Sequence, residues 1–461
     1  MANGTAAKSD FSKGNVAKTI LRLSLPLMVA ELVHVFYSLI DRMYIGHIPD
    51  VGTQCLTGIG LCIPLVSFIA AFAQLCATGG SSLMSIARGE GDTGKAERIQ
   101  NTAFSMLVVF GVVLTLLMYF FADDVLMFIG ADADTLPFAL DYFSVYIIGT
   151  VFSLISLGMN PFINAQGFPT VGMITVLSGA VINLALDPLF IFTFGLGVRG
   201  AAWATVVAQV VSAAWVFRFL RGKKAVLRVT RFELDPGCVG KIMKLGITGF
   251  VFKATNSAAQ AVVNATLKIF GGPLGVLYIG ATSIINSLRE VIHQPCFAIT
   301  RGAQPVMSFN YGAKLYHRVL ESIRFTTGAA VLYNLFIFIV LQLSAGVLPR
   351  IFSTDPELVA LSAHCIRIYF AALVFMSFQQ TAQHTFVALN KPKFALFFSL
   401  FRKAVLVIPL TLLLPRSGLG VEGVFWAEVI SEVIGGIASY GTLMFTVVPE
   451  LRNGEKKGIQ A

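Results

Sequence analysis

The stretch GLGVRGAAWA at residues 195–204 returns as GLGVEGVFWA at residues 418–427, a separation of 223 positions. The same offset relates Trp203 to Trp426, Pro169 to Pro392 and Gly89 to Gly312. A single offset at several places is the signature of an internal duplication. The sequence therefore predicts two copies of one structural unit within the chain of 461 residues.

Apolar runs of about 20 residues, long enough to cross a bilayer as helix, recur in both copies. Hydrophobic residues make up 56% of the chain and charged residues 13%, whereas soluble proteins are about a quarter charged. The alternation of a transmembrane β-barrel is not visible. We therefore predict an all-α polytopic membrane protein with twelve transmembrane helices, at 16–46, 54–87, 97–121, 136–158, 168–193, 200–221, 239–270, 274–308, 316–345, 358–386, 394–414 and 422–447.

Each copy holds six of these spans, so both copies start on the same side of the membrane. This predicts a parallel repeat of two six-helix bundles, an architecture typical of secondary transporters. We assign residues 1–221 to an N-terminal bundle, 222–238 to a basic cytoplasmic linker and 239–461 to a C-terminal bundle. Lys and Arg concentrate in the linker, the termini and alternate loops, which predicts cytoplasmic termini in the cytoplasmic (inner) membrane.

Several classes of function are disfavoured by what the sequence lacks. The net charge of +10 comes from loops, without the basic, aromatic-interleaved stripe of a nucleic-acid binder. The six cysteines are scattered, without CxxC, and read as packing residues. There is no GxxxxGK[ST] phosphate loop and no zinc-binding spacing. We expect no enzyme activity, no metal and no cofactor apart from a coupling ion.

Polar side chains inside the first bundle form three stripes at helical spacing. The first span carries Glu31, His34, Ser38 and Asp41; the fifth carries Asn183 and Asp187; the sixth carries Thr205, Gln209 and Ser212. A carboxylate in hydrocarbon is costly unless it is paired, hydrated or protonated, so each is a candidate functional group. Converging stripes could bind and release a proton, or coordinate Na⁺; a purely structural hydrogen-bond network is the alternative. Pro188 would break the fifth span directly after Asp187.

The second copy replaces these groups. The offset sets Asn264 against Asp41, Leu410 against Asp187, Glu428 against Thr205 and Glu432 against Gln209. Arg402 and Lys403 replace Gly179 and Ala180. We expect most of these charges to pair with one another, with snorkelling of Arg402 and Lys403 as the alternative. The sharper hypothesis is a substrate cavity, for which the candidates are Lys253, Asn256, Gln260, Asn264, Arg289, Glu290, Glu428 and Glu432.

Three segments carry a family resemblance: LSLPLMVAELVHVFYSLIDRMYIG at 23–46, LDPLFIFTFGLGVRGAAWATVVAQ at 186–209 and AQPVMSFNYGAKLYHRV at 303–319. They resemble the multidrug and toxic compound extrusion (MATE) family, prokaryotic type. The resemblance implies a V-shaped pair of bundles that exports organic, often cationic or amphipathic, compounds and xenobiotics in exchange for H⁺ or Na⁺.

The resemblance also implies a cation-coupling site in the N-terminal bundle. Its residues match Asp41, Asn183, Asp187 and Thr205 in this chain. Glu31, His34 and Gln209 are candidates for a proton relay, with a packed Glu31–His34 pair as the alternative for the first two. Some MATE proteins instead bind Na⁺ through acids on the seventh and tenth helices. Those spans lack acids in the corresponding stripes here, which favours coupling through the first bundle and H⁺ over Na⁺.

The first hypothesis for function is therefore multidrug efflux by a proton-coupled antiporter through alternating access. A flippase for lipid-linked saccharides and, less favoured, an integral-membrane enzyme are the alternatives. The expected partners are small-molecule substrates and membrane lipids, with no nucleic acid, and we expect the chain to act as a monomer.

Overall fold

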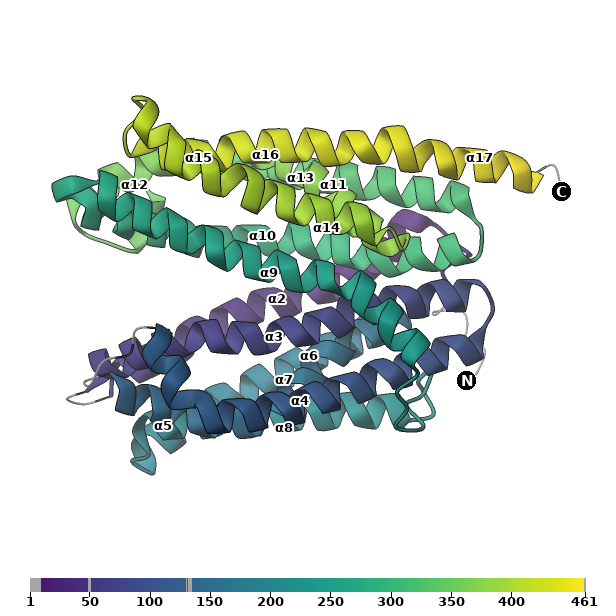
Figure 1. Cartoon of the computed structure of the whole chain (residues 1–461), viewed down its shortest axis with the longest axis horizontal. Helices are drawn as coiled ribbons and strands as arrows, with labels where there is room; N and C mark the ends of the chain where they lie inside the picture. Colours follow the sequence, from purple (N-terminus) through teal and green to yellow (C-terminus); the bar gives the residue numbers. More distant parts are fainter. Residues whose placement is uncertain (1–9, 49–50, 130, 132–134, 460–461) are drawn as a thin grey trace. The chain divides into compact units, whose positions relative to one another are not determined.

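The computed structural model describes residues 10–48, 51–129, 131 and 135–459, and this part of the chain is overwhelmingly helical. The chain divides into two compact units, which we call unit 1 (Met1–Lys13 and Leu25–Phe250) and unit 2 (Gly14–Ser24 and Val251–Ala461). The first copy of the repeat provides most of unit 1, and the second copy provides most of unit 2 (Figure 1).

The helices of the first copy follow the predicted spans closely. They are α2 (Val16–Gly46), α3 (Gly52–Gly89), α4 (Thr93–Ile129), α5 (Leu136–Tyr146), η1 (Ile147–Gly149), α6 (Thr150–Ala165), α7 (Pro169–Pro188), η2 (Leu189–Thr193) and α8 (Gly197–Arg221). Segment η1 is a 3₁₀ turn that joins α5 to α6, whereas η2 is a π-helix that continues α7.

The second copy repeats this order with more interruptions. Its helices are α9 (Pro236–Phe270), η3 (Gly272–Leu274), α10 (Gly275–Gly312), α11 (Tyr316–Ser344), η4 (Leu348–Ile351), α12 (Pro356–Tyr369), α13 (Leu373–Ala388), α14 (Pro392–Leu400), η5 (Phe401–Val407), α15 (Ile408–Leu413), η6 (Leu414–Ser417), α16 (Glu422–Thr442), η7 (Leu443–Val447) and α17 (Val448–Ile459). Segments η5 and η7 are π-helices.

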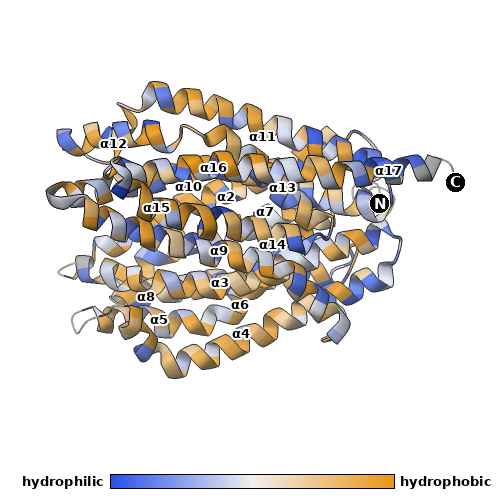
Figure 2. Ribbon diagram, turned by 45° about the horizontal axis from the view of Figure 1, so that its top comes forward, coloured by the Kyte–Doolittle hydropathy of each residue, from blue (hydrophilic) through white to orange (hydrophobic). Residues whose placement is uncertain are grey.

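Most of these helices are long and apolar enough to cross a membrane. Over the residues that the structure describes, nine pass on length and hydropathy, and the pair α12–α13, bent by 50°, makes a tenth. Helices α9 and α10 also have the length, with 35 and 38 residues, but their polar side chains lower the hydropathy. With them, every predicted span corresponds to a helix or helix pair. Hydrophobic residues dominate the helix bodies (Figure 2).

The first helix of each copy is shared between the two units. The beginning of α2, up to Ser24, belongs to unit 2, where a Cβ at Gly302 of α10 would lie 2.3 Å from Ser24 Oγ. The beginning of α9 belongs to unit 1, where a Cβ at Gly246 would lie 2.0 Å from the Leu75 carbonyl of α3. Glycine is therefore required for these close helix crossings.

The basic segment between α8 and α9 is held firmly against unit 1. Gln166 donates to Gln100 Oε1 at 2.9 Å and accepts from the Leu227 N–H at 3.0 Å, while Gln100 donates to the Leu227 carbonyl at 3.2 Å. Both glutamines are fully buried. The segment is thus fixed to α4 and to the end of α6 by a ring of hydrogen bonds.

The end of this segment caps α9. Asp235 Oδ1 accepts from the Gly237 N–H at 2.8 Å, and this bond holds the pKa of the half-buried carboxyl below its usual range. Because the pKa of Asp235 is lower in the folded chain than in the unfolded chain, the cap contributes its full stabilisation at pH values above the ordinary Asp pKa. That contribution is lost as the pH falls through the lowered value.

The ring of hydrogen bonds around Gln166 predicts a clear stability effect. We expect Gln166→Leu to lower the free energy of unfolding by about 1–3 kcal/mol, because the buried Leu227 N–H and Gln100 oxygen lose their partners. The measurement is the thermal unfolding midpoint of the purified protein in detergent. Gln54→Leu, at an exposed position of α3, is the matched control. Equal midpoints for the two variants would contradict the anchoring role of the segment.

Candidate functional site

The polar groups of the first bundle gather where α7 is interrupted. Asp187 is the penultimate residue of α7, and Pro188 ends the helix. Because proline has no N–H and its ring crowds the carbonyl four residues earlier, the regular ladder cannot continue. The chain goes on as the π-helix η2, a feature that is frequent at functional sites.

Three of the four predicted coupling residues lie on α7 and α8 and are joined by hydrogen bonds. Asn183 Nδ2 donates to Asp187 Oδ1 at 3.2 Å and to Thr205 Oγ1 at 3.4 Å. The Thr205 hydroxyl in turn donates to the Ala201 carbonyl at 3.0 Å. Asp187 is fully buried, and Asn183 is 3% exposed. The amide therefore fixes the carboxylate between the two helices.

The fourth predicted residue, Asp41 of α2, completes the group. Its carboxyl and that of Asp187 lie within hydrogen-bonding reach of each other. Asp41 Oδ1 and Asp187 Oδ2 are buried and, among the described residues, accept no hydrogen bond. Two such carboxylates repel each other when both are ionised. A proton or a small cation between them would remove the repulsion.

Two tyrosines of α5, which the sequence analysis did not single out, cover this carboxylate pair. Tyr142 lies beside Thr205, and Tyr146 lies beside Gln209 and Ser153. Their rings stack with centroids 5.9 Å apart. The spacing of four residues on one helix was the available signal, but it is equally typical of core packing.

The candidate relay residues are divided between two places. Gln209 lies beside Tyr146, on the same helix as Thr205 and one turn further along. Glu31 is half-buried and His34 is exposed, with the imidazole packed edge-on to Tyr37 at 5.0 Å. Seven residues of helix separate His34 from Asp41, a rise of about 10 Å. Direct contact between those two side chains is therefore not part of the site.

In the second copy, four of the predicted cavity residues line one small pocket. They are Asn256, Gln260, Arg289 and Glu428. Lys253, Asn264 and Glu290 are exposed, and Glu432 is buried beside Arg402 outside the pocket lining. Asn286, Tyr369 and Lys403 join the lining, although the sequence did not assign them to a cavity.

The charges on the eleventh and twelfth spans pair as predicted. Glu428 Oε1 accepts from Lys403 Nζ at 2.8 Å and also from Arg402, which donates to Gln379 Oε1 at 2.9 Å. The side chains of Arg402, Lys403 and Glu428 are only 7–8% exposed. The snorkelling alternative is therefore wrong in this structure. The π-helix η5 carries both basic residues into the interior.

Comparison with known proteins gives one family. The family model described as MatE matches residues 26–189 and 254–413 of this chain. The multidrug export protein MepA of Staphylococcus haemolyticus (strain JCSC1435) is 24% identical over 446 residues, which cover 96% of this chain and 95% of MepA.

Solved structures show the same fold. One is a multidrug resistance MATE family transporter of the MOP superfamily in an outward-facing conformation, with a TM-score of 0.89, 21% identity and coverage of 96% of this chain and 98% of that one. Another is a MATE protein in the bent conformation, with a TM-score of 0.89, 22% identity and coverage of 97% and 98%. These matches confirm the predicted all-α fold of twelve helices in two bundles.

The packing of α8 against η2 gives a testable prediction about the site. A Cβ at Gly200 would lie 2.7 Å from the carbonyl group of Phe190, so Gly200→Ala must push α8 away from η2. We expect a lower unfolding temperature in detergent, because the close packing of α8 against η2 is lost. Gly60→Ala, where a Cβ would meet nothing within 4 Å, is the control. An unaltered unfolding temperature for Gly200→Ala would contradict the close packing.

Proposed function

The chain belongs to the MatE family, and on this premise we propose that it is a secondary active multidrug efflux transporter. It exports organic, cationic or amphipathic compounds by alternating access, as an antiporter, in exchange for H⁺. The observation that carries the proposal is the pair formed by the half-buried Asp41 and the fully buried Asp187, whose facing carboxylates each have one oxygen without a hydrogen-bond partner among the described residues. The MepA relatives are named as multidrug export proteins, which supports a transporter over the enzyme and flippase alternatives.

The geometry supports H⁺ over Na⁺ as the coupling ion. Na⁺ is held by several oxygen ligands, as other hard cations are. Here Asn183 turns its NH₂ group toward Asp187 and Thr205, so its oxygen faces away from both. The Thr205 hydroxyl accepts from Asn183 and donates to Ala201. A proton shared by the two carboxylates needs no further ligand.

Protonation would act on the break in α7. When one proton is bound, the carboxyl groups of Asp41 and Asp187 together carry one negative charge, and the shared proton holds them together. Without the proton, two charges repel across a dry contact. Since Pro188 and η2 interrupt the regular helix beside Asp187, the end of this span can shift at lower cost than an unbroken helix. Gln209, Glu31 and His34 are the candidate groups that deliver the proton.

The location and orientation of the chain in the membrane are proposed from its hydropathy and from the distribution of its charges. The chain is a multi-pass membrane protein. We propose the cytoplasmic (inner) membrane and cytoplasmic termini from the distribution of Lys and Arg in loops, and, as a separate expectation, action as a monomer. Residues 1–9 and 460–461 lie outside the described part of the chain.

The carboxylate pair predicts how transport fails. We expect Asp41→Asn and Asp187→Asn each to reduce proton-gradient-driven efflux of ethidium from proteoliposomes by at least about tenfold, because an amide cannot exchange a proton near neutral pH. Asp141→Asn is the matched control, since Asp141 forms an exposed pair with Arg199 at 2.7 Å and such pairs contribute little. Full transport by both site variants would overturn the coupling role.

The coupling ion is tested with two separate gradients. In vesicles that contain the wild-type chain, we expect a pH gradient at equal Na⁺ to drive ethidium transport. A Na⁺ gradient at equal pH should leave transport at the level of protein-free vesicles, because the site offers too few oxygens. Transport driven by Na⁺ alone would replace H⁺ with Na⁺ in the proposal and leave the exporter function standing.

A further inference from the structure

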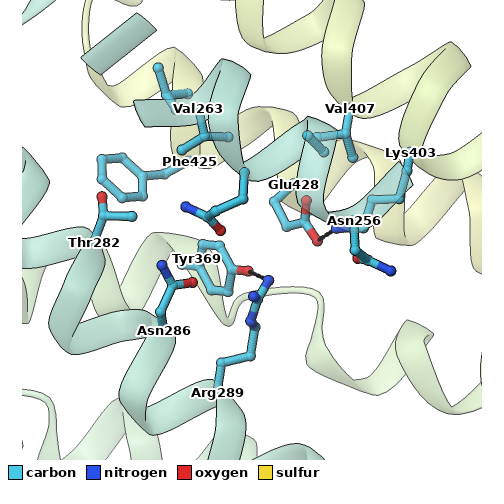
Figure 3. Close-up of a pocket in the computed structure, with 13 residues that line it drawn as sticks. Asn256, Val263, Thr282, Asn286, Arg289, Tyr369, Lys403, Val407, Phe425 and Glu428 are labelled. Carbon is cyan, nitrogen blue, oxygen red and sulfur yellow. Dashed lines mark hydrogen bonds and ion pairs between the residues drawn. The ribbon is translucent and has the colours of Figure 1, made fainter. Parts of the chain in front are cut away.

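Unit 2 contains a small cavity lined largely by polar side chains. Its volume is about 30 Å³, room for roughly one or two waters. Amide side chains reach it from two helices: Asn256 and Gln260 from α9, and Asn286 from α10. Thr282, Arg289, Tyr369, Lys403 and Glu428 complete the polar lining (Figure 3).

The charges around the cavity do not balance. Arg289, Arg402 and Lys403 are basic, whereas Glu428 and Glu432 are acidic. Both Arg402 and Lys403 donate to Glu428, and Arg402 lies 3.6 Å from Glu432. These two carboxylates are therefore already engaged by two cations. Among the described residues that surround the cavity, one positive charge is left over.

The extra charge belongs to Arg289. Its guanidinium donates to the neutral Tyr369 hydroxyl at 3.0 Å (Figure 3). Within the described residues, it has no carboxylate at ion-pair distance. Its neighbour Glu290 is exposed and does not line the cavity. Arg289 is half-buried, and a cation that is partly withdrawn from water without a counter-charge favours an anion in the cavity.

Two residues that line the cavity correspond to residues beside the carboxylate pair of the first copy, although Asn264 and Leu410, the counterparts of Asp41 and Asp187, do not line it. The offset of 223 sets Tyr369 against Tyr146 and Glu428 against Thr205. Lys403 stands where the first copy has Ala180, and Arg289 where it has Val66. Unit 1 thus has a surplus of negative charge at its carboxylate pair, and unit 2 has a surplus of positive charge around its cavity.

We propose that this cavity binds one monovalent anionic group, either a carboxylate of a transported compound or a free halide. The guanidinium of Arg289 holds the charge, and the NH₂ groups of Asn256, Gln260 and Asn286 can donate to it. Lys403 keeps its bond to Glu428 and adds positive potential. The volume admits a group of only a few atoms, so the rest of a compound would lie outside the cavity.

The carboxylate form of this proposal rests on the proposed export function, whereas the halide form does not. Equilibrium binding therefore tests it without any gradient. The probes are rhodamine 110, which has a free carboxylate, and rhodamine 123, its methyl ester. Fluorescence polarisation gives the Kd of each for the full-length chain in nanodiscs, with gluconate as the only small anion. Failure of gradient-driven efflux would leave these Kd values unaffected.

Arg289→Gln is the deciding variant. We expect it to weaken rhodamine 110 binding about tenfold, equivalent to about 1.4 kcal/mol, while the Kd of rhodamine 123 changes less than about twofold. Arg289→Lys keeps the charge and should restore most of the affinity. Lys268→Gln removes an exposed cation from α9 and should change neither Kd, which controls for the loss of charge.

A second measurement tests for a bound halide, and it keeps the proposal testable if a variant folds poorly. The unfolding temperature of the wild-type chain is compared in chloride and in gluconate. A rise in chloride that is absent in Arg289→Gln assigns the cavity to a halide, even where the two dyes bind alike. The proposal is overturned if Arg289→Gln shifts both dyes equally or neither, and chloride has no effect that depends on Arg289.

Discussion

An ionised side chain cannot remain alone in the dry interior of a helical membrane bundle. In unit 1 this constraint falls on Asp187, which is fully buried. Among the described residues, its environment supplies an amide from Asn183 and a second acid from Asp41, with no base at ion-pair distance of Asp187. In unit 2 the constraint falls on Arg402 and Lys403, which share Glu428. Each bundle is arranged around the partners that these few groups require.

Helix irregularity provides the means of bringing those partners together. A π-helix holds one extra residue per turn, so the side chains that follow it are rotated relative to a regular helix. In the first copy, η2 begins two residues after Asp187. In the second copy, η5 contains Arg402 and Lys403 themselves. The fifth span of each copy is thus distorted next to its charge, though not at equivalent residues.

Much of this could be predicted from the sequence. Apolar runs locate most spans, and the repeat supports α9 and α10, whose polar residues lower their hydropathy. Spacing and family resemblance together selected Asp41, Asn183, Asp187 and Thr205, which lie together in the structure.

The remaining parts of the sites depend on tertiary packing. Periodicity defines the faces of a helix, but not which neighbour covers each face. Arg289 and Glu290 are adjacent in sequence and point about 100° apart on α10, so one lines the cavity and the other is exposed. Tyr142 and Tyr146 have the spacing of ordinary core residues, and only the packing of α5 places them over Thr205 and Gln209.

The comparison of the two copies separates what the fold requires from what function requires. The position of Asp187 is occupied by Leu410 in the second copy, so the helix itself does not need an acid there. Both bundles contain a charged site, and the local sequence determines its sign and which residues form it. A bundle with a surplus charge is more stable when a counter-charge is bound. A ligand can shift a conformational equilibrium only through such a difference in affinity between states. A bound ion can therefore change the packing of a bundle by neutralising the surplus charge of that bundle.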